Sequence, residues 1–99
     1  MRLTNEFQPI RDWAEDKGIY ESGDVKTQSL KLYEEAGELA KAVLNDDLAE
    51  IEDAIGDSVV VLVSVAELAG LRIEDCINMA YNVIAKRTGK MQNGTFIKD

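Results

Sequence analysis

The feature that most restricts the fold is a short polar break, Asn45-Asp46-Asp47, between two long helical patterns. The first pattern runs from Val25 to Leu44 and the second from Leu48 to Ala69, with Gly70 as its stop. An aspartate precedes each pattern at the position of a helix N-cap. Because two long helices joined by so short a turn pack antiparallel, we expect a helical hairpin at the centre of the fold.

The segment before this hairpin predicts one more helix, from about Leu3 to Lys17. Apolar residues recur there at three- and four-residue steps, as on one face of a helix. Pro9 fits only the first turn of a helix, so the start can fall later than Leu3. Gly18 is the expected stop, and the serine and glycine within Ile19–Asp24 indicate a loop.

The segment after the hairpin predicts a fourth helix, from about Ile73 to Thr88, which ends at Gly89. An apolar stripe at helical spacing supports this helix. In the last ten residues, Asn93-Gly94 is a strong tight-turn signal, so we expect a small C-terminal hairpin or an ordered tail.

The run Val59–Val63 is apolar on every side, and a helix of that kind has to be surrounded by partners. Ninety-nine residues make one domain and supply few such partners. We therefore expect one all-α domain over residues 1–99, with four helices, that assembles with at least one further copy of itself.

Several classes of protein are excluded by what the sequence lacks. It has no histidine, which removes histidine bases, catalytic triads and most transition-metal sites, and Cys76 is a single cysteine without a disulfide partner. The polar N-terminal segment is unlike a signal peptide, and the longest apolar run is far too short to span a bilayer. We expect a cytoplasmic protein that is not bound to a membrane.

The net charge of −8 comes from one part of the chain, the 24 residues from Glu34 to Asp57, while the rest is neutral. Such acidity argues against a nucleic-acid polymer as partner. At 100° per residue, Glu34, Glu35 and Glu38 share an arc of about 100° on the first hairpin helix. Three acids of the second hairpin helix, Glu50, Asp53 and Asp57, lie within an arc of about 60° around the helix axis. Glu52 lies on the opposite side of that helix.

Two acidic stripes on antiparallel helices can face one another and hold a hard cation. Mg²⁺ prefers oxygen ligands and is usually shared between carboxylates and substrate phosphates, and Mn²⁺ is the alternative. Paired carboxylate stripes are also a recurrent way to build a metal site inside a helical bundle. The competing interpretation is a solvated acidic surface whose first-turn acids favour the helix dipole.

The segment Glu34-Glu35-Ala36-Gly37-Glu38 resembles the EExxE motif of MazG-like all-α nucleoside triphosphate pyrophosphohydrolases. Ile55-Gly56-Asp57, followed by an apolar run, resembles the second motif of that family, ExxD. The resemblance covers nearly the whole chain. It implies a four-helix bundle assembled as a homodimer or homotetramer. It also implies an enzyme that uses Mg²⁺ to hydrolyse a nucleoside triphosphate between the α- and β-phosphates, with a role in removing unwanted nucleotides. It also implies that the motif carboxylates are catalytic residues and metal ligands: Glu34, Glu35, Glu38 and Asp57.

One position departs from the family pattern, because Ala54 stands where the second motif has its glutamate. Asp53 and Glu50 lie on neighbouring parts of the same helical face, and either one can substitute, Asp53 being the better candidate. A literal ExxD also exists one turn earlier, from Glu50 to Asp53. The sequence alone does not decide which of these carboxylates bind the metal.

Basic and amide side chains near the end of the fourth helix are candidates for binding the triphosphate: Asn82, Lys86, Arg87 and Lys90. Lysine and arginine supply charge-assisted hydrogen bonds to phosphate oxygens. Asn82 and Lys86 are one turn apart on the same face. Lys31, one turn before Glu34, can reach a phosphate or relieve repulsion among the acids. Basic residues at a helix C-terminus also complement its dipole without any ligand.

Trp13 has two interpretations, as a residue that stacks on a nucleobase or as part of the core. Two alternatives to the main function also stay open. One is phosphoribosyl-ATP pyrophosphohydrolase, of the same superfamily, and the other is a non-catalytic helical module whose acidic stripe docks a basic partner.

Overall fold

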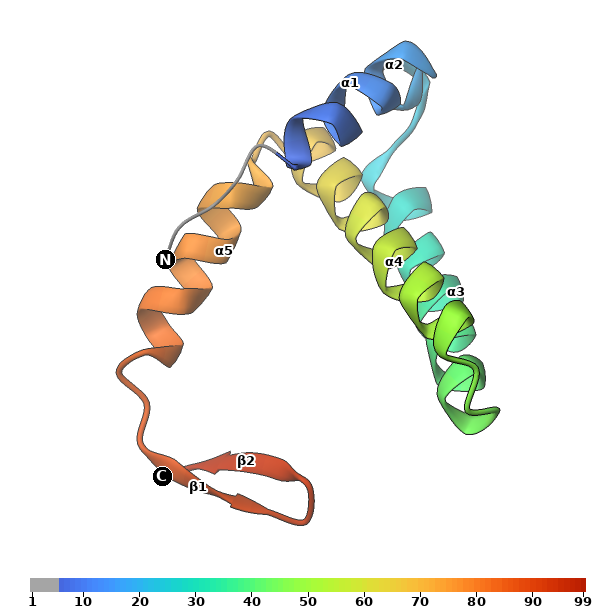
Figure 1. Cartoon of the computed structure of the whole chain (residues 1–99). Coiled ribbons are helices and arrows are strands. Elements are labelled where there is room, and N and C mark those ends of the chain that lie inside the picture. The colour runs from blue at the N-terminus through green and yellow to red at the C-terminus, as the bar shows by residue number, and fades with distance from the viewer. Residues whose placement is uncertain (1–5) are drawn as a thin grey trace.

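The computed structural model describes residues 6–99 and shows five helices followed by a two-stranded hairpin (Figure 1). Residues 3–5 of the first expected helix lie outside the described residues. The elements are α1 (Phe7–Asp16), α2 (Ile19–Ser22), α3 (Val25–Leu44), α4 (Leu48–Leu68), α5 (Ile73–Ile84), β1 (Gly89–Gln92) and β2 (Thr95–Lys98).

The expected central hairpin is confirmed, with α3 and α4 packed side by side and antiparallel (Figure 1). The carboxylate of Asp24 accepts a hydrogen bond from the backbone N–H of Thr27 at 2.8 Å, which caps α3. Asp47 caps α4 in the same way, through the backbone N–H of Glu50 at 3.1 Å. These caps satisfy free N–H groups at both helix starts and fix where each helix begins.

Two expectations about the ends of elements are wrong. Part of the expected loop Ile19–Asp24 is a helical turn, α2, because Gly18 takes a left-handed φ of 79° and lets a new helix start at once. Helix α5 ends at Ile84 instead of Thr88. The reason is that Thr88 belongs to the base of the C-terminal hairpin, where its hydroxyl donates to the carboxylate of Asp99 at 2.7 Å.

The helices of one chain do not close into a compact bundle. The radius of gyration is 15.6 Å, whereas a compact domain of this length has about 13 Å. Among residues 6–99 the buried apolar side chains are few and mostly small: Ala14, Ala42, Ala54, Val61, Val63 and Ala66. The run Val59–Val63 is accordingly buried only in part, and several large apolar side chains of α3 and α4 face solvent, with Leu44 84% exposed.

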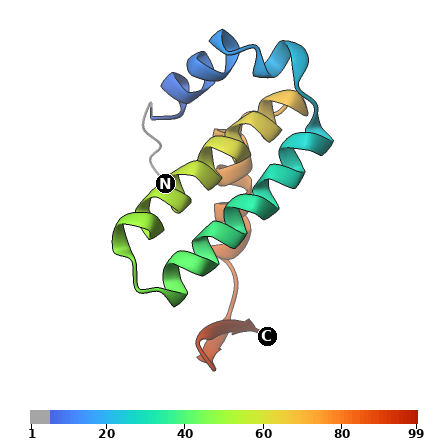
Figure 2. The same cartoon turned by 90° about the vertical axis from the view of Figure 1, so that its right-hand side faces the viewer.

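Helix α5 leaves α4 at a steep angle and runs away from the hairpin (Figures 1 and 2). Within residues 6–99 no single helix has the length and apolar character to cross a membrane. Helices α4 and α5 reach that length and apolarity only when taken together, and they are bent by 103° at their junction.

The junction of α1, α4 and α5 is held by the buried guanidinium of Arg11. Its two terminal nitrogens, Nη1 and Nη2, donate to the two carboxylate oxygens of Glu74 at 2.6 Å each. Its Nε donates to Gln8 at 3.1 Å and lies 3.8 Å from the Glu67 carboxylate. Because such a bidentate pair has strict geometry, it fixes the direction in which α5 leaves the fold.

This ion pair predicts a loss of stability in acid. The hydrogen bonds from Arg11 lower the pKa of Glu74 from 4.5 to about 2. A lowered carboxyl pKa stabilises the fold above pH 4.5, and that contribution disappears as the pH falls from 4.5 toward 2. We expect the difference in urea midpoint between the wild type and Glu74→Gln to be constant near neutrality and to shrink across this window. A difference in urea midpoint that does not change with pH would contradict the lowered pKa of Glu74.

Candidate carboxylate site

The two acidic stripes face one another across the groove between α3 and α4, as expected. They line a single cavity of about 190 Å³, together with the methyl group of Ala54. Each helix contributes three carboxylates, which are the six predicted metal ligands: Glu34, Glu35 and Glu38 from α3, and Glu50, Asp53 and Asp57 from α4. The capped antiparallel hairpin thus brings together residues that are up to 23 positions apart in sequence.

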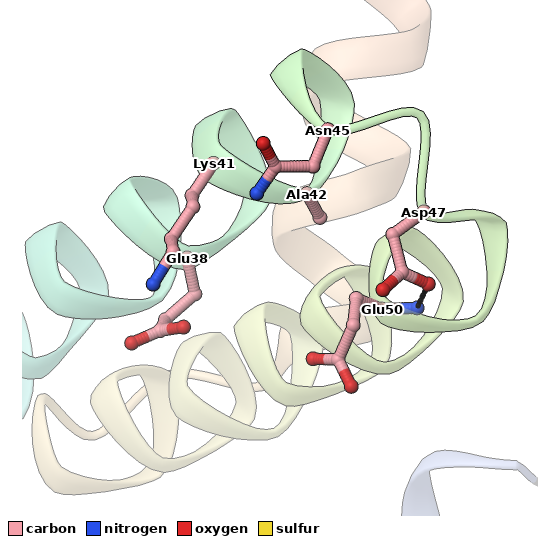
Figure 3. A pocket seen from close by; sticks show the side chains of 6 residues that line it. All are labelled: Glu38, Lys41, Ala42, Asn45, Asp47 and Glu50. Carbon is pink, nitrogen blue, oxygen red and sulfur yellow. Dashed lines mark hydrogen bonds between the residues drawn. The ribbon is translucent and has the colours of Figure 1, made fainter.

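A second cavity of about 280 Å³ continues this groove toward the turn between the helices (Figure 3). Glu38 and Glu50 belong to both cavities, and in Figure 3 the carboxylate of Glu38 extends from α3 toward α4. The sequence analysis missed Lys41 and Asn45 in this wall. Lys41 carried a signal, since it is the one base within the acidic 24-residue segment, whereas Asn45 looked like an ordinary turn residue.

The surroundings of Glu35 raise the pKa of its carboxyl group. Partial burial raises the pKa of Glu35, and the negative charges of Asp57, Glu34 and Glu38 raise it further, while Lys31 opposes them. Among the described residues, no three acidic side chains stand close enough to share one metal ion. The carboxylates therefore line a common cavity without clustering around one point.

Both candidates for the missing family glutamate reach the cavity. Ala54, which occupies the position of that glutamate, is buried between the helices. Glu50 and Asp53 flank it on α4 and both line the cavity wall. Glu50 also lines the second cavity, so it has access to a larger part of the groove than Asp53.

An aromatic and partly apolar cavity of about 410 Å³ adjoins the carboxylates. It shares Glu35 and Asp57 with the acidic cavity, and Lys31 lies in its wall as the sequence analysis expected. Trp13 from α1 forms one side and is 48% exposed, which excludes the core interpretation within this chain.

Two polar residues of this aromatic cavity were missed by the sequence analysis, Gln28 from α3 and the buried Ser64 from α4. Each stands alone in its helix without a motif, so no pattern in the sequence marked it. The remaining wall is apolar, from Ile19, Val60 and Val61. The cavity thus combines a flat aromatic side, apolar walls and a few polar groups, as small-molecule sites usually do.

The predicted phosphate-binding residues are not brought to the carboxylates within one chain. Neither Asn82 nor Lys86, Arg87 or Lys90 lines any of these three cavities. Lys86 also lies beyond the end of α5, so it does not share a helical face with Asn82, contrary to expectation. In Figure 2, α5 lies behind α3 and α4 and the C-terminal hairpin lies below them, and Figure 3 likewise shows α5 behind the acidic groove.

Fold and site together define an all-α protein with a groove of facing carboxylates next to an aromatic cavity. The model of the MazG nucleotide pyrophosphohydrolase domain matches residues 24–92. The chain therefore belongs to the MazG family.

A relative from Haemophilus phage HP1 (strain HP1c1) is 41% identical over 58 residues, which are 59% of this chain. It is described as an uncharacterized 18.2 kDa protein in the rep-hol intergenic region, and the matched part is 36% of its length. The chain thus spans about a third of that relative. No solved structure matches the chain.

Proposed function

We propose that the protein is a Mg²⁺-dependent nucleoside triphosphate pyrophosphohydrolase that releases a nucleoside monophosphate and pyrophosphate. The observation that carries this proposal is the cavity in which α3 and α4 each place three carboxylates. Membership of the MazG family supports the reaction class. We also propose that the protein works in the cytoplasm, in contact with the nucleotide pool.

The donor set of the cavity fits Mg²⁺, or Mn²⁺ in its place. All six charged groups are carboxylates, which are hard oxygen donors, and the chain has no histidine to favour zinc or copper. The pKa of Glu35 is raised first by partial burial and then by the negative charge of Asp57 and the other carboxylates, a charge that a divalent cation would neutralise. When bound, the ion supplies charge neutralisation at the phosphates and lowers the pKa of the attacking water.

The residues of the chain have distinct tasks in this proposal. Glu34, Glu35, Glu38 and Asp57 would hold the cation, with Asp53 or Glu50 in place of the family glutamate. Glu35 lies where the acidic and aromatic cavities meet, so it can orient the water and accept its proton. Lys31, in the same wall, donates to a phosphate oxygen.

The aromatic cavity is proposed to hold the base of the nucleotide. We expect Trp13→Ala to lower kcat/KM roughly 5- to 150-fold, since stacking of a base on an aromatic ring contributes about 1–3 kcal/mol. The same variant should hydrolyse inorganic tripolyphosphate as the wild type does, because that compound has no base. Equal losses on both compounds would show that Trp13 only supports the fold.

We also propose that the working protein is a homodimer or homotetramer. Large apolar side chains on the outside of the central hairpin, such as Tyr33 and Leu48, are more than three-quarters exposed. So many large apolar side chains exposed on two packed helices favour a partner that covers them. A second copy of the chain can cover it and complete a bundle that one chain leaves open.

A product assay tests the proposed reaction. The protein is incubated with a panel of canonical and modified ribo- and deoxyribonucleoside triphosphates and with phosphoribosyl-ATP, in Mg²⁺ and in EDTA. The proposal predicts monophosphate and pyrophosphate in equal amounts, in Mg²⁺ only. Release of orthophosphate would indicate a different phosphatase chemistry. Absence of turnover on every compound would favour the non-catalytic interaction module.

A further inference from the structure

Two polar residues, Gln28 of α3 and Ser64 of α4, lie at the same height on the central hairpin. Both line the aromatic cavity, which also contains Glu35 and Asp57. Those two carboxylates are neighbours across the helices, since the charge of Asp57 contributes to the raised pKa of Glu35. Gln28 precedes Glu35 by seven residues and Ser64 follows Asp57 by seven. Because α3 and α4 are antiparallel, both polar residues are displaced in the same direction, by about 10.5 Å at 1.5 Å per residue.

This displacement places the two polar groups where the far edge of a base would lie. A nucleotide whose phosphates sit at the carboxylates extends along the cavity through its sugar to its base. Trp13 forms one side of the cavity and offers a surface on which the base can stack. The rest of this wall is apolar, and Ser64 is only 1% exposed. A base edge that enters here meets few polar groups, so those groups decide which edge fits.

Behind Ser64 lies a small group of buried polar atoms. The hydroxyl of Tyr20 and Oε1 of Glu67 are both buried, and neither has a hydrogen-bond partner among the described residues. Burial raises the pKa of Tyr20 and the charge of Glu67 raises it further, whereas Ser64 lowers it, so the three side chains are neighbours. Buried polar atoms are nearly always paired, either directly or through an ordered water. Tyr20, Glu67 and Ser64 are therefore expected to form one hydrogen-bonded chain.

The direction of the hydrogen bonds in this chain follows from the donors that each group has. The carboxylate of Glu67, which lies 3.8 Å from the Arg11 guanidinium, can only accept. It therefore takes the single proton of the Tyr20 hydroxyl, and the Tyr20 oxygen accepts the proton of Ser64. With its proton directed inward, Ser64 presents only lone pairs to the aromatic cavity.

We propose that the inner end of the aromatic cavity selects a base with an exocyclic amino group, whose N–H is accepted by the Ser64 oxygen. This inference rests on the proposed function and adds the class of base to it. Cytosine and adenine carry such a group, whereas uracil and hypoxanthine place a keto oxygen there, against the lone pairs of Ser64. The carboxamide of Gln28 holds a donor and an acceptor and can turn to pair with either class. Ser64 therefore selects the base, and Tyr20 is a positioning residue that orients its proton.

Two matched pairs of substrates test the selection. Each pair differs only in the exchange of the amino group for a keto group: CTP with UTP, and ATP with ITP. In Mg²⁺ we expect kcat/KM to be roughly 5- to 150-fold higher for the amino member of a pair, from the cost of a buried polar group without a partner. Ser64→Ala should bring this ratio close to one. Gln28→Leu should lower both members by a similar factor and keep the ratio.

Two further variants separate selection from support of the fold. Tyr20→Phe frees the proton of Ser64, so the ratio should shrink while kcat/KM for the keto member is kept or rises. A residue that only supports the fold would lower all four triphosphates alike. Ser58→Ala is the matched control, because this serine of α4 donates to the carbonyl of Ala54 at 2.8 Å and lines none of the three cavities. It should keep the wild-type ratio.

Equal kcat/KM within the pairs for the wild type, or a preference for the keto members, would overturn the proposal. A ratio that Ser64→Ala leaves unchanged would overturn it as well. Absence of turnover on every triphosphate would reject the proposed reaction alone, and calorimetric binding of CMP and UMP would then decide. Tighter binding of CMP, lost in Ser64→Ala, would support the selection by the cavity, whereas equal binding or no binding of the two would overturn it.

Discussion

Replacing Glu35 by glutamine is expected to abolish turnover and, at the same time, to stabilise the metal-free protein against heat. The pKa of Glu35 is raised by partial burial and by neighbouring carboxylates. The ionised form therefore costs free energy in the folded state at neutral pH, and a neutral amide removes that cost. Loss of a group that serves the metal and the attacking water should slow the reaction about 10²- to 10⁴-fold, from the several kcal/mol that a metal ion contributes.

The measurement is a pair of melting curves, in EDTA and in Mg²⁺, together with the turnover rate. We expect the Tm in EDTA to be higher for Glu35→Gln than for the wild type, and Mg²⁺ to raise the Tm of the wild type far more than that of the variant. Glu52→Gln is the matched control, because Glu52 is an exposed glutamate of α4 that lines none of the three cavities described above. It should keep wild-type turnover. A lower Tm of Glu35→Gln in EDTA would mean that Glu35 supports the fold and is not a strained functional group.

Replacing Arg11 by methionine is expected to give the largest loss of stability of any single substitution considered for this chain. The guanidinium is 6% exposed and makes two hydrogen bonds of 2.6 Å to Glu74. Removing one partner of a buried ion pair leaves the other charge uncompensated, which costs about 3–5 kcal/mol. Because the pair joins α1 to α5, we also expect the C-terminal hairpin that follows α5 to lose its fixed direction.

Urea unfolding at a fixed protein concentration measures this effect. Arg72→Met is the matched control, since Arg72 is an exposed arginine 3.8 Å from the same Glu74 oxygen. An exposed pair of this kind contributes about 0–1 kcal/mol. The double variant Arg11→Met/Glu74→Met should recover part of the loss, because Glu74 then leaves no uncompensated charge, whereas the Glu67 carboxylate, 3.8 Å from Arg11, remains. Equal losses from Arg11→Met and Arg72→Met would contradict this account of the junction.

The central hairpin was predictable because every local signal in its sequence agrees. An aspartate caps each helix, the connecting turn is too short for any other packing, and the acidic residues repeat at helical spacing. As a result, α3 has the predicted bounds and all six predicted metal ligands line one cavity. Local signals of this kind predict the folded structure because they depend only on residues that are close together in the sequence.

The elements that the sequence analysis placed wrongly depend on contacts far along the chain or on residues without a strong preference. Nothing between Ile84 and Gly89 stops a helix, yet the bond between Thr88 and Asp99 assigns those residues to the hairpin. The direction of α5 depends on Arg11, which is 63 residues from Glu74. Gln28 and Ser64 became candidates only when α3 and α4 were placed beside Trp13.

The most direct test of the central claim is a titration with Mn²⁺, followed by the spin resonance signal of the free ion. If the facing carboxylates of α3 and α4 form a divalent-cation site, the wild-type protein and Glu52→Gln should remove the free Mn²⁺ signal in a saturable way. Glu35→Gln and Asp57→Asn should remove much less. Equal depletion by the wild type and by both cavity variants, or no depletion by the wild type, would contradict the assignment of this groove as the metal site.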